Sequence, residues 1–273
     1  MYRRVLTVQD ISCVGQCSTT VALPILSACG LETCILPTAL LSTHTGGFGK
    51  PAVVHFDGVL TDIWHHWQEN GITFDAVLVG YLGSLAAVEA AGEIIDNLLA
   101  PGGVSIVDPA MADNGKLYSG FDDAYVRAIG ALVRKADIIL PNVTEAAILS
   151  GLPYQEKIDK NYVNRILDDL HHPCAVLTGV DFGDGRTGVV LREGTAQQEY
   201  HHKRVKKSCH GTGDIFAAAF TGALMQGKSR FDAVKMAADF TCRCVENTAN
   251  APAHWYGVRF EPLLPELTEL LGL

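Results

Sequence analysis

Short runs of β-branched and aliphatic residues alternate with longer stretches of helical periodicity along most of the chain. The short runs predict strands, and the longer stretches predict helices between them. Two neighbouring runs that meet at Glu193-Gly194 predict a hairpin. We expect strands over 5–9, 33–37, 76–79, 104–107, 137–140, 175–178, 187–191 and 198–202, and helices over 18–29, 57–69, 84–99, 212–226, 230–248 and 262–271.

This alternation predicts an α/β fold with a mainly parallel central sheet and helices on both faces. The hairpin predicts antiparallel strands at one edge. The sequence has no repeat, low-complexity segment or linker, so we expect one domain over residues 1–273. Ligands bind beyond the carboxyl ends of the strands in such sheets. We therefore expect one shared rim for the polar residues that follow strands, namely Asp10, the loop 42–50, Tyr81, Asp108, Asn142 and Thr178.

Composition narrows the class of protein further. Hydrophobic residues make up 48% of the 273 and charged residues 19%, which excludes a disordered or fibrous chain. The net charge of −9, with no basic run longer than two residues, argues against nucleic acid or a membrane surface as partner. No apolar run reaches the length of a membrane span, and the run after Arg3-Arg4 is too short for a signal peptide. The eight cysteines contain no C-x-x-C pair and indicate reduced thiols in the cytoplasm.

The segment 210–214, H-G-T-G-D, leads into a predicted helix. Unpaired N–H groups at a helix N-terminus attract phosphate oxygens, and glycine lets an anion come close. The positive helix end favours a carboxylate at Asp214, which would there accept the proton of a hydroxyl that attacks a phosphoryl group. The structural alternative is that Thr212 caps the helix and Asp214 only complements its dipole.

Two other polar segments each follow a buried predicted strand. Asp108 and Asp113 share a loop, which is typical of a Mg²⁺ site that keeps several waters, although two turns explain the same residues. Asn142 and Glu145, three residues apart, fit either a capping box at the start of a helix or contacts with a metal and a nucleotide. Neither segment decides between these interpretations alone.

Together these segments resemble the ribokinase-like superfamily, and specifically its vitamin B6 branch, the pyridoxal and pyridoxamine kinases. The matching motifs occur in the family's order: S-x-H-T-G at 42–46, D-P-x-M-x-D at 108–113 with a following L-Y, P-N-x-T-E at 141–145, and G-T-G-D at 211–214. The resemblance runs from Val5 to about Thr248. It implies a homodimer that transfers the γ-phosphoryl group of Mg·ATP to the 5′-hydroxymethyl group of pyridoxal, pyridoxine or pyridoxamine, in salvage of pyridoxal 5′-phosphate.

The resemblance also assigns roles to individual residues. Asp214 is similar to the general base, and the amides of Gly211, Thr212 and Gly213 resemble the anion hole for the transferring phosphoryl group. The substrate pocket implied by the family consists of Asp10, His44, Thr45, Tyr81 and Tyr118. The implied nucleotide contacts are Asn142, Thr178 and Gly179. The implied acidic group consists of Asp108, Asp113 and Glu145. It positions Mg²⁺ and a monovalent cation, mostly through water.

Two positions depart from the family pattern. Many pyridoxal kinases carry serine after the first strand, where this chain has Asp10. A carboxylate there favours a protonated pyridine nitrogen, so we hypothesise a shifted preference among the vitamers. Leu140 stands where some relatives have a polar residue, and a ligand for the monovalent cation is then missing. Cys209 lies five residues before Asp214. Two interpretations are open: its thiol reaches an aldehyde substrate, or it is an ordinary loop thiol.

Other functions fit the sequence less well. Hydroxymethylpyrimidine kinases of the same superfamily usually have cysteine at the position of Asp214. Sugar kinases insert a β-lid after the first strand, where this chain begins a predicted helix by about Ser18. A carrier or regulator that only binds a vitamer or a nucleotide would lack the base or the acidic group, and both are present here. A dehydrogenase would need G-x-G-x-x-G after the first strand, where residues 10–17 offer only Gly15.

Overall fold

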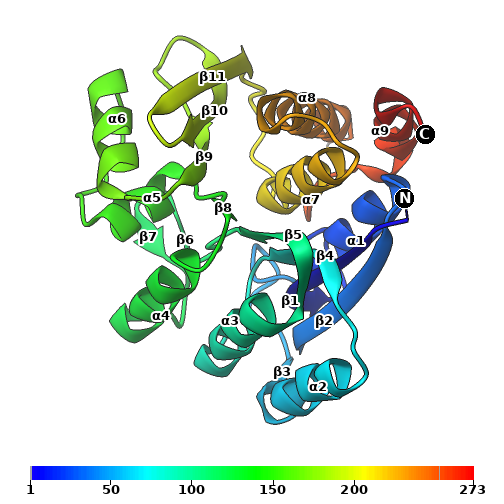
Figure 1. Ribbon diagram of the computed structural model, residues 1–273. Helices are drawn as coiled ribbons and strands as arrows, with labels where there is room; N and C mark the ends of the chain where they lie inside the picture. The colour runs from blue at the N-terminus through cyan, green and yellow to red at the C-terminus, as the bar shows by residue number, and fades with distance from the viewer. Residues whose placement is uncertain (1, 252) are drawn as a thin grey trace.

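A nine-stranded sheet forms the centre of the molecule, seen in a computed structural model that describes residues 2–251 and 253–273 (Figure 1). The strand order is β11-β10-β9-β8-β5-β4-β1-β2-β3. The six strands from β9 to β2 in this order pair in parallel, whereas β3 at one edge and β10 and β11 at the other pair antiparallel. The strands are β1 (Arg4–Ser12), β2 (Glu32–Leu41), β3 (Val53–His55), β4 (Phe74–Val79), β5 (Leu99–Val107), β8 (Ile138–Ile139), β9 (Cys174–Val180), β10 (Arg186–Glu193) and β11 (Ala196–Lys203).

Successive apolar side chains of the central strands alternate between the two faces of the sheet, which explains why both faces are covered. Leu6 of β1 packs into one hydrophobic core and its neighbour Val5 into the other. Val77 and Leu78 of β4 divide between the two cores in the same way. Because successive side chains of a strand point to opposite faces, a run that is apolar throughout requires helices on both sides.

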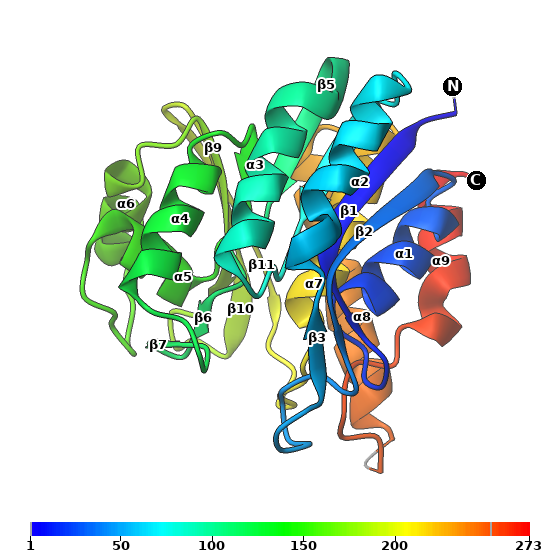
Figure 2. The ribbon, with the colours of Figure 1, turned by 90° about the horizontal axis from the view of Figure 1, so that it is seen from below.

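The helices form those two layers. Figure 1 shows α7 and α8 on one side of β4 and β5 and α2 and α3 on the other, and Figure 2 shows α1 beside α9. The helices are α1 (Thr19–Ala28), α2 (Asp57–Glu69), α3 (Leu85–Leu98), α4 (Asp123–Val133), α5 (Val143–Ser150), α6 (Lys160–Asp169), α7 (Thr212–Met225), α8 (Arg230–Ala249) and α9 (Leu264–Leu271). Side chains of α2 to α6 belong to one core, and those of α1, α7, α8 and α9 belong to the other.

The expected α/β architecture is confirmed, including the hairpin at Glu193-Gly194, which joins β10 and β11 at the sheet edge. Helices α4 and α6 were not predicted, nor were the short edge strand β3 and the two-residue strands β6 (Ala112–Asp113) and β7 (Lys116–Leu117), which pair with each other. Across residues 2–251 and 253–273, no helix has the length and apolar character needed to cross a membrane.

Candidate active site

One pocket of about 660 Å³ opens at the carboxyl ends of the parallel strands, a size typical of a small-ligand site. Asp10, Tyr81, Asp108, Asn142 and Thr178 line it as expected, and the loop 42–50 contributes only its residues 44–46. All the residues to which the resemblance gives roles also lie in its wall: Asp10, His44, Thr45, Tyr81, Asp108, Asp113, Tyr118, Asn142, Glu145, Thr178, Gly179, Gly211, Thr212, Gly213 and Asp214. Their shared location leaves the individual roles to be tested.

Helix α7 begins at the floor of this pocket with an unusual cap. Its N-cap residue is Gly211, at φ 86°, and no side chain accepts a hydrogen bond from the first turn. Thr212 is therefore not the cap, so the structural alternative for the threonine is wrong. A Cβ on Gly211 would overlap the carbonyl oxygen of Gln16, so the close approach requires glycine. The first amides of α7 are left free to face the pocket.

Asp214 lies in the first turn of α7 and is half-buried. Burial raises the pKa of Asp214 from 3.8 to about 7, and the negative charges of Asp108 and Asp10 act in the same direction. The nearby backbone of Ser18 partly opposes the rise in this pKa. A carboxyl group that changes charge near neutral pH suits general-base catalysis.

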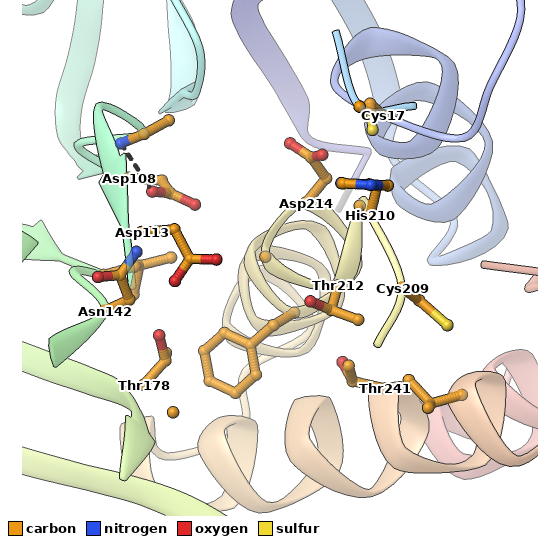
Figure 3. Close-up of a pocket in the computed structure, with 18 of the residues that line it drawn as sticks. Cys17, Asp108, Asp113, Asn142, Thr178, Cys209, His210, Thr212, Asp214 and Thr241 are labelled. Atoms are coloured by element: carbon orange, nitrogen blue, oxygen red, sulfur yellow. Dashed lines mark hydrogen bonds between the residues drawn. The ribbon is translucent and has the colours of Figure 1, made fainter. Parts of the chain in front are cut away.

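Asp108 follows β5 and faces Asp214 across the pocket (Figure 3). Its Oδ1 accepts from the N–H of Ala110 at 3.1 Å. Its Oδ2 lies 3.6 Å from where a Cβ on Gly213 would stand, so it points at the start of α7. Burial raises the pKa of Asp108. Asp113, on the same side, is exposed and accepts from the N–H of Asn114 at 2.8 Å.

Asn142 and Glu145 form the capping box at the start of α5. Asn142 Oδ1 accepts from the N–H of Glu145 at 3.0 Å, and Glu145 Oε2 accepts from the N–H of Asn142 at 2.9 Å. The other carboxylate oxygen of Glu145 accepts from the N–H of Met111 at 3.0 Å and of Ala112 at 3.4 Å. Burial, followed by the charge of Asp108, raises the pKa of Glu145 well above its ordinary value. The buried carboxylate therefore holds the loop that carries Asp108 and Asp113.

The acidic residues do not converge on one point. Among residues 2–251 and 253–273, no three His, Cys, Asp or Glu side chains lie close enough to bind one metal ion directly. Asp108 and Asp113 nevertheless offer carboxylate oxygens at the pocket wall beside the α7 amides. This donor set fits a Mg²⁺ ion that keeps most of its waters and takes its remaining ligands from phosphate.

Asp10 lies in β1, deep in the wall and 2% exposed. Its Oδ2 accepts from the hydroxyl of Ser12 at 3.0 Å, and the side chain of Ser18 lies near the same carboxylate. Its backbone N–H donates to the carbonyl oxygen of Tyr81 at 3.1 Å. Burial raises the pKa of Asp10, and the two serines partly oppose the rise.

His44 has both ring nitrogens engaged within the protein. Its Nδ1 accepts from the N–H of Gly46 at 3.0 Å, so the proton is on Nε2, which donates to the carbonyl oxygen of Tyr256 at 2.8 Å. Burial lowers the pKa of His44 and favours this neutral ring. His44 and Thr45 beside it both line the pocket.

Tyrosine rings form the wall near the loop after β4. The ring of Tyr81 lies 5.5 Å from that of Phe121, and the ring of Tyr118 lies 6.5 Å from it. Burial raises the pKa of Tyr118, and the charges of Glu145 and Asp108 add to this, so its phenol stays protonated. Tyr118 is 40% exposed, and its aromatic face is available to a planar ligand.

The far end of the pocket extends beyond the predicted residues. Thr178 N–H donates to Pro141 at 2.9 Å, and Gly179 follows at φ 70°. The wall then continues over β10, the segment after β11 and α8, through Val189, Arg204, Lys207, Ala238, Thr241 and Val245. One signal for this wall is present in the sequence, namely the basic pairs Lys203-Arg204 and Lys206-Lys207 after the predicted hairpin. Cys209 also lines the pocket, and burial raises the pKa of its thiol.

The parallel sheet, the free helix N-terminus and the facing carboxylates define a phosphotransferase of the ribokinase-like fold. A family model described as phosphomethylpyrimidine kinase matches residues 24–258. A pyridoxine/pyridoxal/pyridoxamine kinase of Bordetella bronchiseptica is 28% identical over 263 residues, covering 90% of each chain. Pyridoxal kinase from Lactobacillus plantarum superposes with a TM-score of 0.90 at 34% identity, covering 98% of this chain and 97% of that one.

A third relative has the name of the matched family and was crystallised with a vitamin B6 vitamer. It is a putative phosphomethylpyrimidine kinase from Bacteroides thetaiotaomicron, crystallised with pyridoxal, with 30% identity, a TM-score of 0.88, and coverage of 100% of this chain and 96% of that one. The chain belongs to the phosphomethylpyrimidine kinase family, within the ribokinase-like superfamily, and in that family to the vitamin B6 kinases. It is an ATP-dependent phosphotransferase that acts on an alcohol.

Proposed function

We propose that the protein phosphorylates the 5′-hydroxymethyl group of a vitamin B6 vitamer with Mg·ATP. The observation that carries this proposal is Asp214, a carboxyl group with a pKa of about 7, which lies beside the free amides of α7 and faces Asp108. The related kinases that use or contain pyridoxal support the choice of substrate.

In the reaction, Asp214 accepts the proton of the attacking hydroxymethyl group. The amides of Gly211, Thr212 and Gly213 stabilise negative charge on the phosphoryl oxygens. They lie at the start of α7, where no side chain caps the first turn. General-base catalysis of this kind contributes about 10²–10⁴-fold to the rate.

Asp108 and Asp113 are the residues that would hold Mg²⁺, mostly through water. Bound there with ATP, the ion would neutralise charge on the phosphates. Glu145 supports them indirectly, because its Oε1 accepts from the N–H groups of Met111 and Ala112 in their loop, while its Oε2 accepts from the N–H of Asn142. We also expect a monovalent cation near this loop, although Leu140 in the wall supplies no side-chain oxygen to it.

The two ends of the pocket suggest where each substrate lies. The pyridine ring would lie between the Tyr81 and Tyr118 side and the loop of Thr45, with Asp10 at its polar edge. The nucleotide phosphates would contact Thr178 and Gly179, with the amide of Asn142 supporting the turn beside them. The base would then lie against the wall of β10 and α8. There Thr241 has a buried hydroxyl without a hydrogen-bond partner in the described part of the chain.

We further propose a homodimer in the cytoplasm. The edge strand β3 exposes Val54 at 58% and Val53 at 43%, and neighbouring Val59, at the start of α2, is 45% exposed. An apolar edge of this kind favours association with another chain. The eight cysteines are all free thiols, which agrees with a reducing compartment.

The test is ADP release from Mg·ATP with pyridoxal, pyridoxine, pyridoxamine or hydroxymethylpyrimidine as acceptor. We expect turnover with at least one vitamer at a kcat/KM above that of the pyrimidine, and none after Mg²⁺ is chelated. Turnover of the pyrimidine alone would instead assign the protein to thiamine synthesis. ATP binding without turnover of any of the four would contradict the proposal.

A further inference from the structure

Gln16 lies between two glycines that come from distant parts of the chain. A Cβ on Gly211 would overlap the carbonyl oxygen of Gln16, and a Cβ on Gly257 would stand 2.8 Å from its backbone nitrogen. Only a residue without a Cβ allows contacts as close as these. Gln16 therefore has the start of α7 on one side and the segment 254–261, near the C-terminus, on the other.

The side chain of Gln16 is bound by both ends of this segment. Its Nε2 donates to Glu261 Oε1 at 3.2 Å, and its Oε1 lies 3.2 Å from His254 Nε2. Because a carboxylate can only accept, the amide nitrogen faces Glu261 and the amide oxygen faces His254, whose Nε2 therefore donates. One side-chain amide thus satisfies two partners seven positions apart, and together they hold the residue in place.

The segment 254–261 is itself fixed to the last turn of α8. Asn247 Nδ2 donates to the carbonyl oxygen of Arg259 at 2.8 Å. The N–H of Arg259 donates to the hydroxyl of Thr248, a fully buried side chain, at 2.9 Å. The segment is therefore anchored to the body of the protein between its two contacts with Gln16.

We propose that Gln16 is a positioning residue, which fixes the first turn of α7 relative to the segment 254–261. The amides of Gly211, Thr212 and Gly213 are the anion hole of the proposed function, and Gly211 packs on the carbonyl of Gln16. A displaced Gln16 would move these donors, and their stabilisation of the phosphoryl oxygens depends on where they point. The inference rests on the proposed function for its kinetic consequence, and on the contacts of Gln16 for the link itself.

The kinetic test replaces Gln16 with methionine, which keeps the length of the side chain and removes both hydrogen bonds. We expect kcat to fall about 3- to 30-fold, as for the loss of one or two hydrogen bonds. The KM values for Mg·ATP and the pyridine alcohol should stay within about twofold, because the anion hole acts mainly in the transition state. The exposed Gln68→Met on α2 is the control and should be unchanged. A wild-type kcat in Gln16→Met, or a higher KM with kcat unchanged, would overturn the proposal.

Two variants of Glu261 test the link without any substrate. Glu261→Ala removes the acceptor of the Gln16 amide, whereas Glu261→Gln keeps an oxygen acceptor in its place. The ¹H–¹⁵N signals of Gly211 and Thr212 should shift in Glu261→Ala and stay near their wild-type positions in Glu261→Gln. The exposed Glu269→Ala is the control and should leave both signals in place. Unchanged signals in Glu261→Ala would overturn the proposal.

A double variant tests whether Gln16 and Glu261 act through one contact. Gln16→Met combined with Glu261→Ala should lose no more kcat than Gln16→Met alone, because the second change removes nothing that the first has left. Losses that simply multiply would contradict the shared contact. A wild-type protein that phosphorylates no pyridine alcohol would refute the proposed function, whereas shifted amide signals would still establish the link from Glu261 to α7.

Discussion

His44 and Tyr256 are hydrogen-bonded across 212 positions of sequence, from the imidazole Nε2 to the backbone carbonyl oxygen at 2.8 Å. The bond joins the loop 42–50 to the segment 254–257 near the C-terminus. The ring of Phe48 lies 4.7 Å from that of Trp255 and extends the same junction. Because this loop carries Thr45 into the pocket, the junction fixes one wall of the site.

Replacing His44 with phenylalanine keeps a ring of similar size and removes both hydrogen bonds. We expect a loss of about 1–3 kcal/mol in the free energy of unfolding, measured with urea, and a higher KM for the pyridine alcohol. Trp255, 51% exposed beside this loop, should report the change in its fluorescence. The exposed His66→Phe is the matched control and should leave all three readouts unchanged. Wild-type stability in His44→Phe would contradict the anchoring role.

Asp214→Asn should reduce kcat by about 10²–10⁴-fold, because the amide cannot accept the proton of the substrate hydroxyl. The affinity for Mg·ATP, measured by calorimetry, should change little. Burial disfavours the ionised carboxylate, so the neutral variant should also be more stable than the wild type at pH 8, with a higher Tm. Near-wild-type turnover would exclude Asp214 as the base.

The pH dependence of kcat/KM should report the same group. With a pKa of about 7, Asp214 is protonated in acid and cannot act as a base. Below pH 7, kcat/KM should therefore decrease with a limiting slope of tenfold for each pH unit. The folded state holds this proton more tightly than the unfolded chain, whose value is near 3.8. The group's contribution to stability is therefore greatest below about pH 4 and is lost as pH rises through 7. The stability gap between Asp214→Asn and wild type should accordingly close in acid, and a gap independent of pH would contradict this assignment.

Asp10→Ser tests whether the buried carboxylate selects among vitamers. A carboxylate favours a cationic partner through a charge-assisted hydrogen bond, so the variant should lose most with the vitamer that binds Asp10 as a cation. The measurement is kcat/KM for pyridoxal, pyridoxine and pyridoxamine in both proteins. An unchanged ranking would remove Asp10 from vitamer selection.

The elements of the fold could be predicted where the local pattern of hydrophobic residues decides the structure. The residues of the site could be predicted only where they directly follow a strand or begin a helix. The uniformly apolar strands predicted two covered faces, and Asn142 with Glu145 had the spacing of a capping box. Helix α6 was missed, because it is short and the residues outside its buried face are all charged or asparagine. The buried face consists of Tyr162, Val163, Ile166 and Leu167. Strands β6 and β7, two residues each, exist only through pairing with each other.

Side-chain partners far apart in sequence were beyond prediction. The carboxylate of Glu145 is occupied by the amides of Met111 and Ala112, more than thirty residues away, so it supports the acidic loop. Nothing near His44 in the sequence indicates that the carbonyl oxygen of Tyr256 accepts a hydrogen bond from its Nε2.

The junction between the loop 42–50 and the segment 254–257 also bears on how the protein folds. The two partners, His44 and Tyr256, are separated by 212 positions, and the chain between them contains most of the sheet and both α7 and α8. Contacts of such long sequence separation cost loop-closure entropy and form slowly. The wall that carries Thr45 should therefore be among the last parts of the pocket to become ordered during refolding.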